Sequence, residues 1–388
     1  MADTISIARL RKNPFTVVPG ERVTVWAGYP ELRQALLDIV ESCRSDKIGL
    51  SEFVILHGEL GTGKSHALRY LINWVAEAKK KEFESQVVYF ESLKLAPKMD
   101  FLALYRSAIE MLLDHIRETA DWLDYVIEDS IPDEDKKREA VFAQRKEAKY
   151  ADGSITPTFP GLPRLLRGVK DNDDHAIRIL TGHAEKSVPL SNYGLTGPID
   201  NEFSAVRCLG AYINLCTRGT PALSEGQTLA RNKAFYFLLD EIEMLLDFKP
   251  AEVVSINQGL RDLMNACPEN CCFLFGMTGD ARQIFALFDK FVMRRMSREP
   301  IEIQPLDDEQ AVVFLKEVLK SYRSDPADPD EYPFREQALR KIAIETQEKT
   351  AAGLFRSCRR VLEKAVLAGR LQPGGWIEEQ DAQEFLAT

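Results

Sequence analysis

Short, largely apolar runs alternate along the chain with longer segments in which apolar residues recur at helical spacing. The apolar runs lie at residues 53–56, 86–90, 234–239 and 271–278. Runs of this length are typical of strands buried on both faces, as in a parallel sheet. The helical pattern is found at residues 30–44, 66–81, 101–119 and 253–266. We therefore expect an α/β core in which helices flank a parallel sheet.

Two regions depart from this alternation. From about residue 120 to 233 the chain carries a charge-dense stretch and further helical patterns, which we interpret as a helical insertion in the core. From residue 307 the pattern is helical to the end, apart from a turn rich in Asp and Pro at 324–330. The expected parts are an N-terminal segment and helix at 1–50, the core at 51–304 with its insertion at about 120–233, and a C-terminal helical lid at 305–388.

A glycine-rich turn, GELGTGKS, joins the first apolar run to the next helical segment. It matches the pattern GxxxxGK[ST], in which backbone N–H groups and a helix N-terminus hold a polyphosphate. In such a loop Lys64 neutralises charge on the β- and γ-phosphates, and the Ser65 hydroxyl holds Mg²⁺. The alternative, a chance match, is disfavoured by the strand–loop–helix context. The residues expected to bind the nucleoside triphosphate are Gly58, Glu59, Leu60, Gly61, Thr62, Gly63, Lys64, Ser65 and His66.

The third apolar run ends in two acids, Asp240 and Glu241. Ligands of an open parallel sheet lie outside the carboxyl ends of its strands, so we expect both carboxylates to face the phosphates. Asp240 is suited to organise Mg²⁺ with Ser65, and Glu241 to orient and partly deprotonate the attacking water. A helix N-cap Asp followed by a solvated Glu is the alternative. We interpret Glu243 as a first-turn carboxylate favoured by the helix dipole, with a third site acid as the alternative.

Composition is that of an ordinary soluble globular protein. The 388 residues are 45% apolar and 28% charged, and no apolar stretch is long enough to span a membrane. The N-terminus lacks the apolar core of a signal peptide, and seven cysteines in a chain of this length do not indicate a disulfide framework. We interpret Cys267, Cys271 and Cys272 as buried thiols, with a zinc site as the alternative. We expect a cytoplasmic protein with no membrane partner.

The net charge of −10 does not attract nucleic acid, so DNA contact would need a local basic patch. Two clusters qualify by residue type, and a solvated helix face is the alternative for each. The clusters are Arg164, Arg167 and Lys170, and Lys136, Lys137, Arg138, Arg145 and Lys146.

With the phosphate loop and the acid pair in place, the chain resembles the AAA+ ATPases, particularly their replication-initiator (origin-recognition-like) branch. Residues 13–15 (NPF) and 27–29 (AGY) look like the adenine-side segment of that branch, with Tyr29 in place of its usual Arg. The run that ends at Thr278 resembles the sensor 1 strand, whose terminal polar residue feels the γ-phosphate. The resemblance implies a P-loop AAA+ fold, ATP and Mg²⁺ as cofactors, and ATP hydrolysis.

Two further motifs carry arginines that the resemblance assigns to the nucleotide. Arg294 and Arg295 lie where the family carries an arginine finger, which acts on the γ-phosphate of a neighbouring subunit. We choose Arg295, with Arg294 second. Residues 353–356 (GLFR) resemble the sensor 2 motif, in which Arg356 would clamp the nucleotide from the lid. The alternatives are a solvated arginine pair, a helix-surface Arg356 and, for Thr278, a plain strand-end hydroxyl.

Two short patterns, DEIE at 240–243 and DEYPF at 330–334, look more like ATPases of BREX-type bacterial phage-defence systems. We hypothesise an oligomeric, nucleotide-switched ATPase that associates with DNA as a loader or regulator. The alternative is a signalling ATPase, such as an anti-phage sensor, whose helical insertion binds protein partners without direct DNA contact. A metabolic kinase is a third, weaker interpretation, because the lid and its arginines indicate conformational switching.

Overall fold

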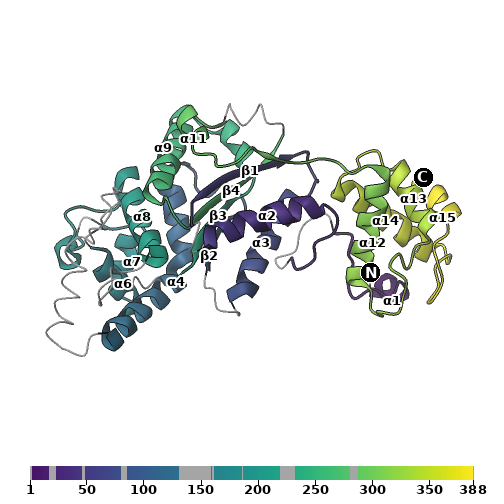
Figure 1. Cartoon of the computed structure of the whole chain (residues 1–388), viewed down its shortest axis with the longest axis horizontal. Coiled ribbons are helices and arrows are strands. Elements are labelled where there is room, and N and C mark those ends of the chain that lie inside the picture. Colours follow the sequence, from purple (N-terminus) through teal and green to yellow (C-terminus); the bar gives the residue numbers. More distant parts are fainter. Residues whose placement is uncertain are drawn as a thin grey trace.

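The computed structural model describes residues 2–16, 23–45, 49–79, 85–130, 159, 161–185, 187–218, 232–279 and 287–387 (Figure 1). Its centre is a five-stranded sheet in the order β2-β3-β4-β1-β5, and every neighbouring pair is parallel. The strands are β1 Glu52–Gly58, β2 Ser85–Phe90, β3 Ala234–Leu239, β4 Cys271–Thr278 and β5 Ile301–Ile303. The parallel sheet expected from the apolar runs is therefore confirmed.

Two layers of helices cover the two faces of the sheet, because successive residues of a strand point to opposite sides. Val54 and Leu56 of β1 pack with α2 (Pro30–Arg44) and α3 (Lys64–Lys79) in one core cluster. Phe53 and Ile55 pack in the other cluster with α4 (Phe101–Ser130), α8 (Glu202–Arg218) and α9 (Pro250–Ala266). Burial on both sides explains why the inner strands β3 and β4 are apolar at nearly every position.

The insertion packs on an elongated α4. Whereas the sequence predicts a helix ending near residue 119, α4 continues to Ser130, and its extension buries Ala120 and Leu123. Against it lie α6 (Leu162–Lys170), α7 (Asp174–Leu180) and η1 (Leu190–Tyr193), whose apolar residues join the same core cluster as the sheet. The charge-dense stretch at 133–149 lies outside the described residues.

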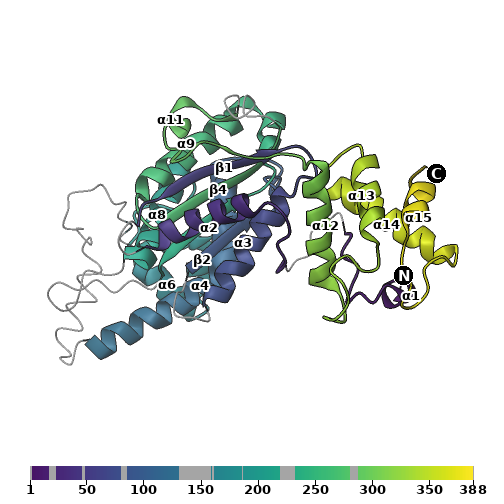
Figure 2. The same cartoon turned by 45° about the vertical axis from the view of Figure 1, so that its right-hand side comes forward.

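A separate hydrophobic core holds the C-terminal helices α12 (Asp308–Tyr322), α13 (Glu336–Glu345), α14 (Ala351–Leu367) and α15 (Glu379–Ala387). Ala8, Leu10 and Phe15, which follow or adjoin the short helix α1 (Ala2–Ile7), are buried in that same core. Both ends of the chain thus lie in this helical region, which stands beside one end of the sheet domain (Figures 1 and 2). We call it the lid.

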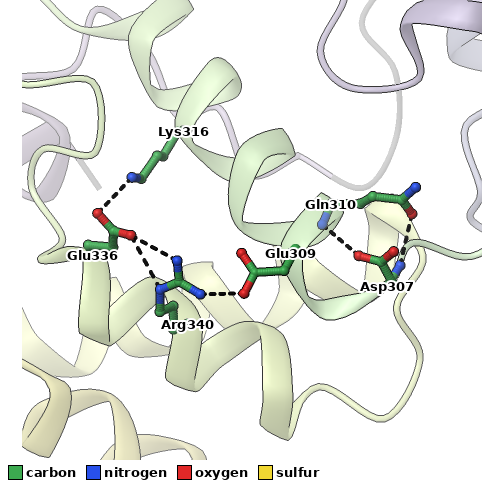
Figure 3. A network of polar contacts seen from close by, with 6 residues as sticks. All are labelled: Asp307, Glu309, Gln310, Lys316, Glu336 and Arg340. Atoms are coloured by element: carbon green, nitrogen blue, oxygen red, sulfur yellow. Dashed lines mark hydrogen bonds and ion pairs between the residues drawn. The ribbon is translucent and has the colours of Figure 1, made fainter.

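Polar contacts join α12 to α13 on the surface of the lid (Figure 3). Glu336 accepts from Lys316 at 3.0 Å and from Arg340 at 3.1 Å, and Arg340 also contacts Glu309. Asp307 caps α12 by accepting the backbone N–H of Gln310. Since exposed ion pairs contribute only about 0–1 kcal/mol each, the buried core supplies most of the stability of the lid.

Candidate functional site

The phosphate loop lies between the end of β1 at Gly58 and the start of α3 at Lys64. The Lys64 ammonium donates to the carbonyl oxygens of Gly58 at 3.0 Å and Glu59 at 2.7 Å. Its side chain is buried, and burial lowers the pKa of the ammonium, while the carboxylates of Glu243 and Asp240 act against that shift. The loop thus folds around a cation, and the carboxylates of Glu243 and Asp240 lie near it at the carboxyl ends of the strands.

Asp240 stands directly after β3 and is 3% exposed. The Ser65 hydroxyl lies close to its carboxylate, which accepts hydrogen bonds from the backbone N–H of Glu241 at 3.0 Å and from the Tyr89 hydroxyl at 3.4 Å. Burial raises the pKa of this carboxyl, and the Ser65 contact acts against the rise. A hydroxyl and a carboxylate oxygen side by side are the hard ligands that Mg²⁺ takes from a protein when phosphate and water supply the rest. Ser65 and Asp240 therefore fit that ion.

Glycine at position 276 makes room for this carboxylate. Gly276 lies in β4, next to β3, and a Cβ added there would stand 2.7 Å from Asp240 Oδ1. Any side chain at this position would displace Asp240. The apolar pattern of the β4 run gives no signal for this requirement.

Glu241 adopts a left-handed backbone conformation with φ 52° and ψ 41°. It is the residue before the 3₁₀ helix η2 (Ile242–Asp247), whose Ile242 and Leu245 are buried in the core. Its own side chain is exposed and lines the cavity described below. Partial burial and the carboxylates of Asp240 and Glu243 raise the pKa of Glu241. A carboxyl with a raised pKa is the kind of group that accepts a proton from water.

Thr278 ends β4 and lines the same cavity. Its backbone N–H donates to Glu243 Oε2 at 3.0 Å. The interpretation of Glu243 as a plain first-turn carboxylate therefore misses this contact, because the sequence does not show that β4 passes beside η2.

A cavity of about 900 Å³ extends from the phosphate loop between the core and the lid. All of the residues expected at the phosphates except Gly58 line it, as do Asp240, Glu241, Thr278 and Arg356. Aromatic side chains also line it, namely Trp26, Tyr29 of the adenine-side segment and Phe355 of the lid. Such a cavity combines polar groups with apolar surface of the kind that accepts a flat heterocycle.

Tyr29 stands where the replication-initiator branch, which the sequence resembles, usually has an arginine. Its hydroxyl donates to the Gln304 carbonyl at 3.0 Å, and burial raises its pKa to about 12. The phenol therefore stays neutral and fixes the adenine-side segment to the strand end that leads into the lid.

The adenine-side segment and the residues before it also touch α12 and α3. One ring nitrogen of His66 lies 2.8 Å from the Val25 carbonyl, and burial lowers the pKa of this imidazole. The Gly28 N–H donates to the Glu317 carboxylate of α12 at 2.6 Å. The His66 side chain thus contacts the chain just before residues 27–29, a role that the sequence pattern does not reveal.

Helix α14 begins on the phosphate loop. The Ala352 N–H donates to the Gly61 carbonyl at 3.1 Å. Gly61 has φ +83°, and a Cβ there would stand 2.7 Å from the Ala352 Cβ, so only glycine permits this approach. Arg356, one turn further along α14, is exposed and pairs with Glu348 at 2.6 Å.

Arg294 and Arg295 do not line the cavity. Both are exposed on the turn after α11 (Lys290–Met293). Beside them Phe291 is 45% exposed, and Lys290, Arg261 and Arg294 all approach its ring within about 6 Å. The structure therefore brings together every predicted site residue except this arginine pair.

The two basic clusters have different outcomes. On α6, Lys170 pairs with Asp121 at 2.8 Å and Asp124 at 2.9 Å, and Arg167 pairs with Asp124 at 3.2 Å. This cluster is largely neutralised by α4. The second cluster, at 136–146, lies outside the described residues.

The described cysteines are all buried, and the part of the chain that the structure describes contains no group of three or more His, Cys, Asp or Glu that could hold a metal ion. The thiol interpretation of Cys267, Cys271 and Cys272 agrees with this burial. Within the same part of the chain, no helix has both the length and the apolar character needed to cross a bilayer.

No family model matches the sequence, and no curated protein does. Among solved structures, the chain is similar to the Aeropyrum pernix ORC2 protein in its ADPNP–ADP complexes, with a TM-score of 0.56 at 12% identity over 97% of this chain and 72% of that one. The chain has the P-loop AAA+ fold. Pyrobaculum aerophilum Cdc6p also matches, with a TM-score of 0.49 at 14% identity over 94% of this chain and 68% of that one. The AAA+ fold class expected from the sequence is confirmed.

Replacement of Gly276 by Ala tests the geometry around Asp240. We expect Gly276→Ala to fold but to bind Mg²⁺-ATP about tenfold more weakly, because a displaced carboxylate costs on the order of 1–3 kcal/mol. Trp26 lines the cavity, so its fluorescence can report the titration. Gly197→Ala is the matched control, since no atom lies within 4 Å of the added Cβ. Equal affinities for the two variants would contradict the displacement.

Proposed function

We propose that this protein binds and hydrolyses ATP with Mg²⁺. The observation that carries the proposal is the meeting of Ser65 and Asp240 beside the buried Lys64, in a cavity large enough for a nucleotide. Nothing in the phosphate loop distinguishes one base from another, and the choice of adenine rests on the family resemblance. The aromatic side chains that line the cavity support a flat base of either kind.

Each residue has a defined role in the proposed reaction. Lys64 exchanges its two carbonyl acceptors for phosphate oxygens, which form stronger charge-assisted hydrogen bonds. Ser65 and Asp240 would hold Mg²⁺, which when bound would neutralise phosphate charge. Glu241 orients the attacking water and takes its proton. Thr278 contacts the terminal phosphate, and Arg356 leaves Glu348 to reach the nucleotide from the lid.

Glu241→Gln separates binding from chemistry. An amide keeps the shape of the carboxylate but accepts no proton, so we expect ATP affinity near that of the wild type and turnover lower by about 10²–10⁴. Calorimetry measures the affinity and phosphate release measures the turnover. Lys64→Ala is the companion variant, for which we expect weak ATP binding. Glu241→Gln with wild-type turnover would remove Glu241 from the mechanism.

We further propose that the active form is an oligomer in which Arg295 acts on the nucleotide of a neighbouring copy. The exposed Arg294 and Arg295 lie outside their own cavity, on a surface that carries Phe291 and its cations. The cavity is lined by three exposed acids, Glu59, Glu91 and Glu241, of which Glu91 pairs with Arg69. Leu60, 81% exposed, stands among these acids. A cationic surface centred on an apolar ring complements such a lining in a head-to-tail assembly.

Mixing of variants tests this role. Arg295→Ala should lower turnover by about 10³-fold or more, as loss of a trans-acting arginine does in GTPases. Adding Lys64→Ala protein, whose own site is inactive, should restore activity because it supplies Arg295 to the intact neighbouring site. Arg294→Ala is the matched control and identifies which of the pair acts. A fully active monomer, or no rescue in the mixture, would contradict the role.

Two settings remain for such an ATPase. In the first it is a DNA-associated loader or regulator, as the initiator-like motifs suggest, and the BREX-like patterns suggest phage defence or a mobile element. In the second it is a signalling ATPase whose insertion binds protein partners in the cytoplasm. The neutralised cluster on α6 and the net charge of −10 favour the second, because they leave that face of the insertion without a basic surface for DNA.

Filter binding over a range of salt concentrations separates the two settings. With the ATP-loaded protein, the DNA-associated setting predicts affinity for single- or double-stranded DNA that falls steeply as salt rises, because phosphate contacts release counterions. The signalling setting predicts no salt-dependent affinity. Lys64→Ala protein, which we expect not to load ATP, is the control for the nucleotide requirement.

A further inference from the structure

One carboxylate at the edge of the site has no part in the roles above. Glu243 stands in η2, two residues after Glu241, and its Oε2 accepts the Thr278 N–H at 3.0 Å. Thr278 lines the cavity, whereas Glu243 is not among the residues that line it. Glu243 therefore contacts the wall of the cavity through the backbone of Thr278.

The sheet explains why Thr278 needs this acceptor. The pairing of β3 with β4 ends at Leu239 and Phe275, so β4 runs three residues past its neighbour before it ends at Thr278. On its other side β4 stays paired with β1 as far as Gly58 and Thr278. The end of β4 thus lacks a strand partner on the β3 side, and a backbone N–H there needs another acceptor.

Glu243 is also tied to the two other groups of the site. It is the first of the carboxylates that act on the Lys64 ammonium, ahead of Asp240. Glu241 directly precedes η2 in a left-handed conformation, and its neighbour Ile242 in η2 is buried. A shift of η2 against β4 would therefore move Glu241 and Thr278 relative to each other.

We propose that Glu243 is a positioning residue for the hydrolysis step. Its carboxylate replaces the missing strand neighbour of Thr278 and so fixes the distance between the residue that contacts the terminal phosphate and the residue that activates water. The inference rests on the proposed ATP hydrolysis. It assigns Glu243 no contact with the nucleotide.

The test compares Glu243→Ala with Glu243→Gln. The alanine removes the acceptor, and since a misplacement of about 1 Å can cost about 100-fold, we expect kcat to fall by about 10- to 100-fold with little change in ATP affinity. The amide oxygen of Gln still accepts the Thr278 N–H, so Glu243→Gln should recover kcat to within about threefold of the wild type. Phosphate release gives kcat and KM, and calorimetry gives the ATP affinity.

Asp247→Ala is the matched control, because Asp247 is an exposed acid at the far end of the same 3₁₀ helix. It should leave kcat unchanged. If Glu243→Ala does not fold, Glu243→Asp takes its place, since its carboxylate is one methylene too short to reach Thr278 in the present geometry. Wild-type kcat in the shortened or truncated variant would overturn the inference. The inference would also be overturned if Glu243→Gln were as slow as Glu243→Ala, or if Glu243→Ala lost ATP affinity and kcat by equal factors.

These outcomes are distinct from failure of the proposed function. If the wild-type protein hydrolyses no ATP, the proposed function itself fails. If the wild type is active and Glu241→Gln is not, while Glu243→Ala matches the wild type, only the positioning role fails.

Discussion

The buried ammonium of Lys64 is the charge on which the arrangement of the site depends. A cation taken out of water costs several kcal/mol unless opposite charges and hydrogen bonds compensate it. Here two loop carbonyls accept from it, and the carboxylates of Glu243 and Asp240 offset its desolvation. Asp240 is itself buried, so the cation and the anion each reduce the cost of burying the other.

The strand order brings these charges together. In the order β3-β4-β1, the strand that ends in Thr278 lies between the strand before Asp240 and the strand that leads into the phosphate loop. Three adjacent carboxyl ends therefore present an acid pair, a hydroxyl and the loop to one cavity. Gly276 and Gly61 allow the close approaches that this arrangement requires, one between strands and one between core and lid.

Much of this could be predicted from the sequence, because the strands are buried on both faces and the phosphate loop is a local motif. The positions of β1, β3 and β4, and the meeting of Ser65 with Asp240, follow from those two facts. β5 could not be found, because it has only three residues and carries Glu302 at its centre. The Glu243–Thr278 contact and the need for glycine at position 276 could not be predicted either, because both depend on which strands are neighbours in space. The neutralised basic cluster on α6 likewise depends on α4 running past residue 119.

The N-terminal residues pack against the helices of the lid. Leu10 pairs with Arg323 in an antiparallel bridge, and Arg11 donates to the carbonyl of Arg323 across 312 positions of sequence. Contacts of such separation form late, because the loop between them must close first. During synthesis the N-terminal segment must therefore wait, with Phe15 uncovered, until the lid helices that bury it have been made.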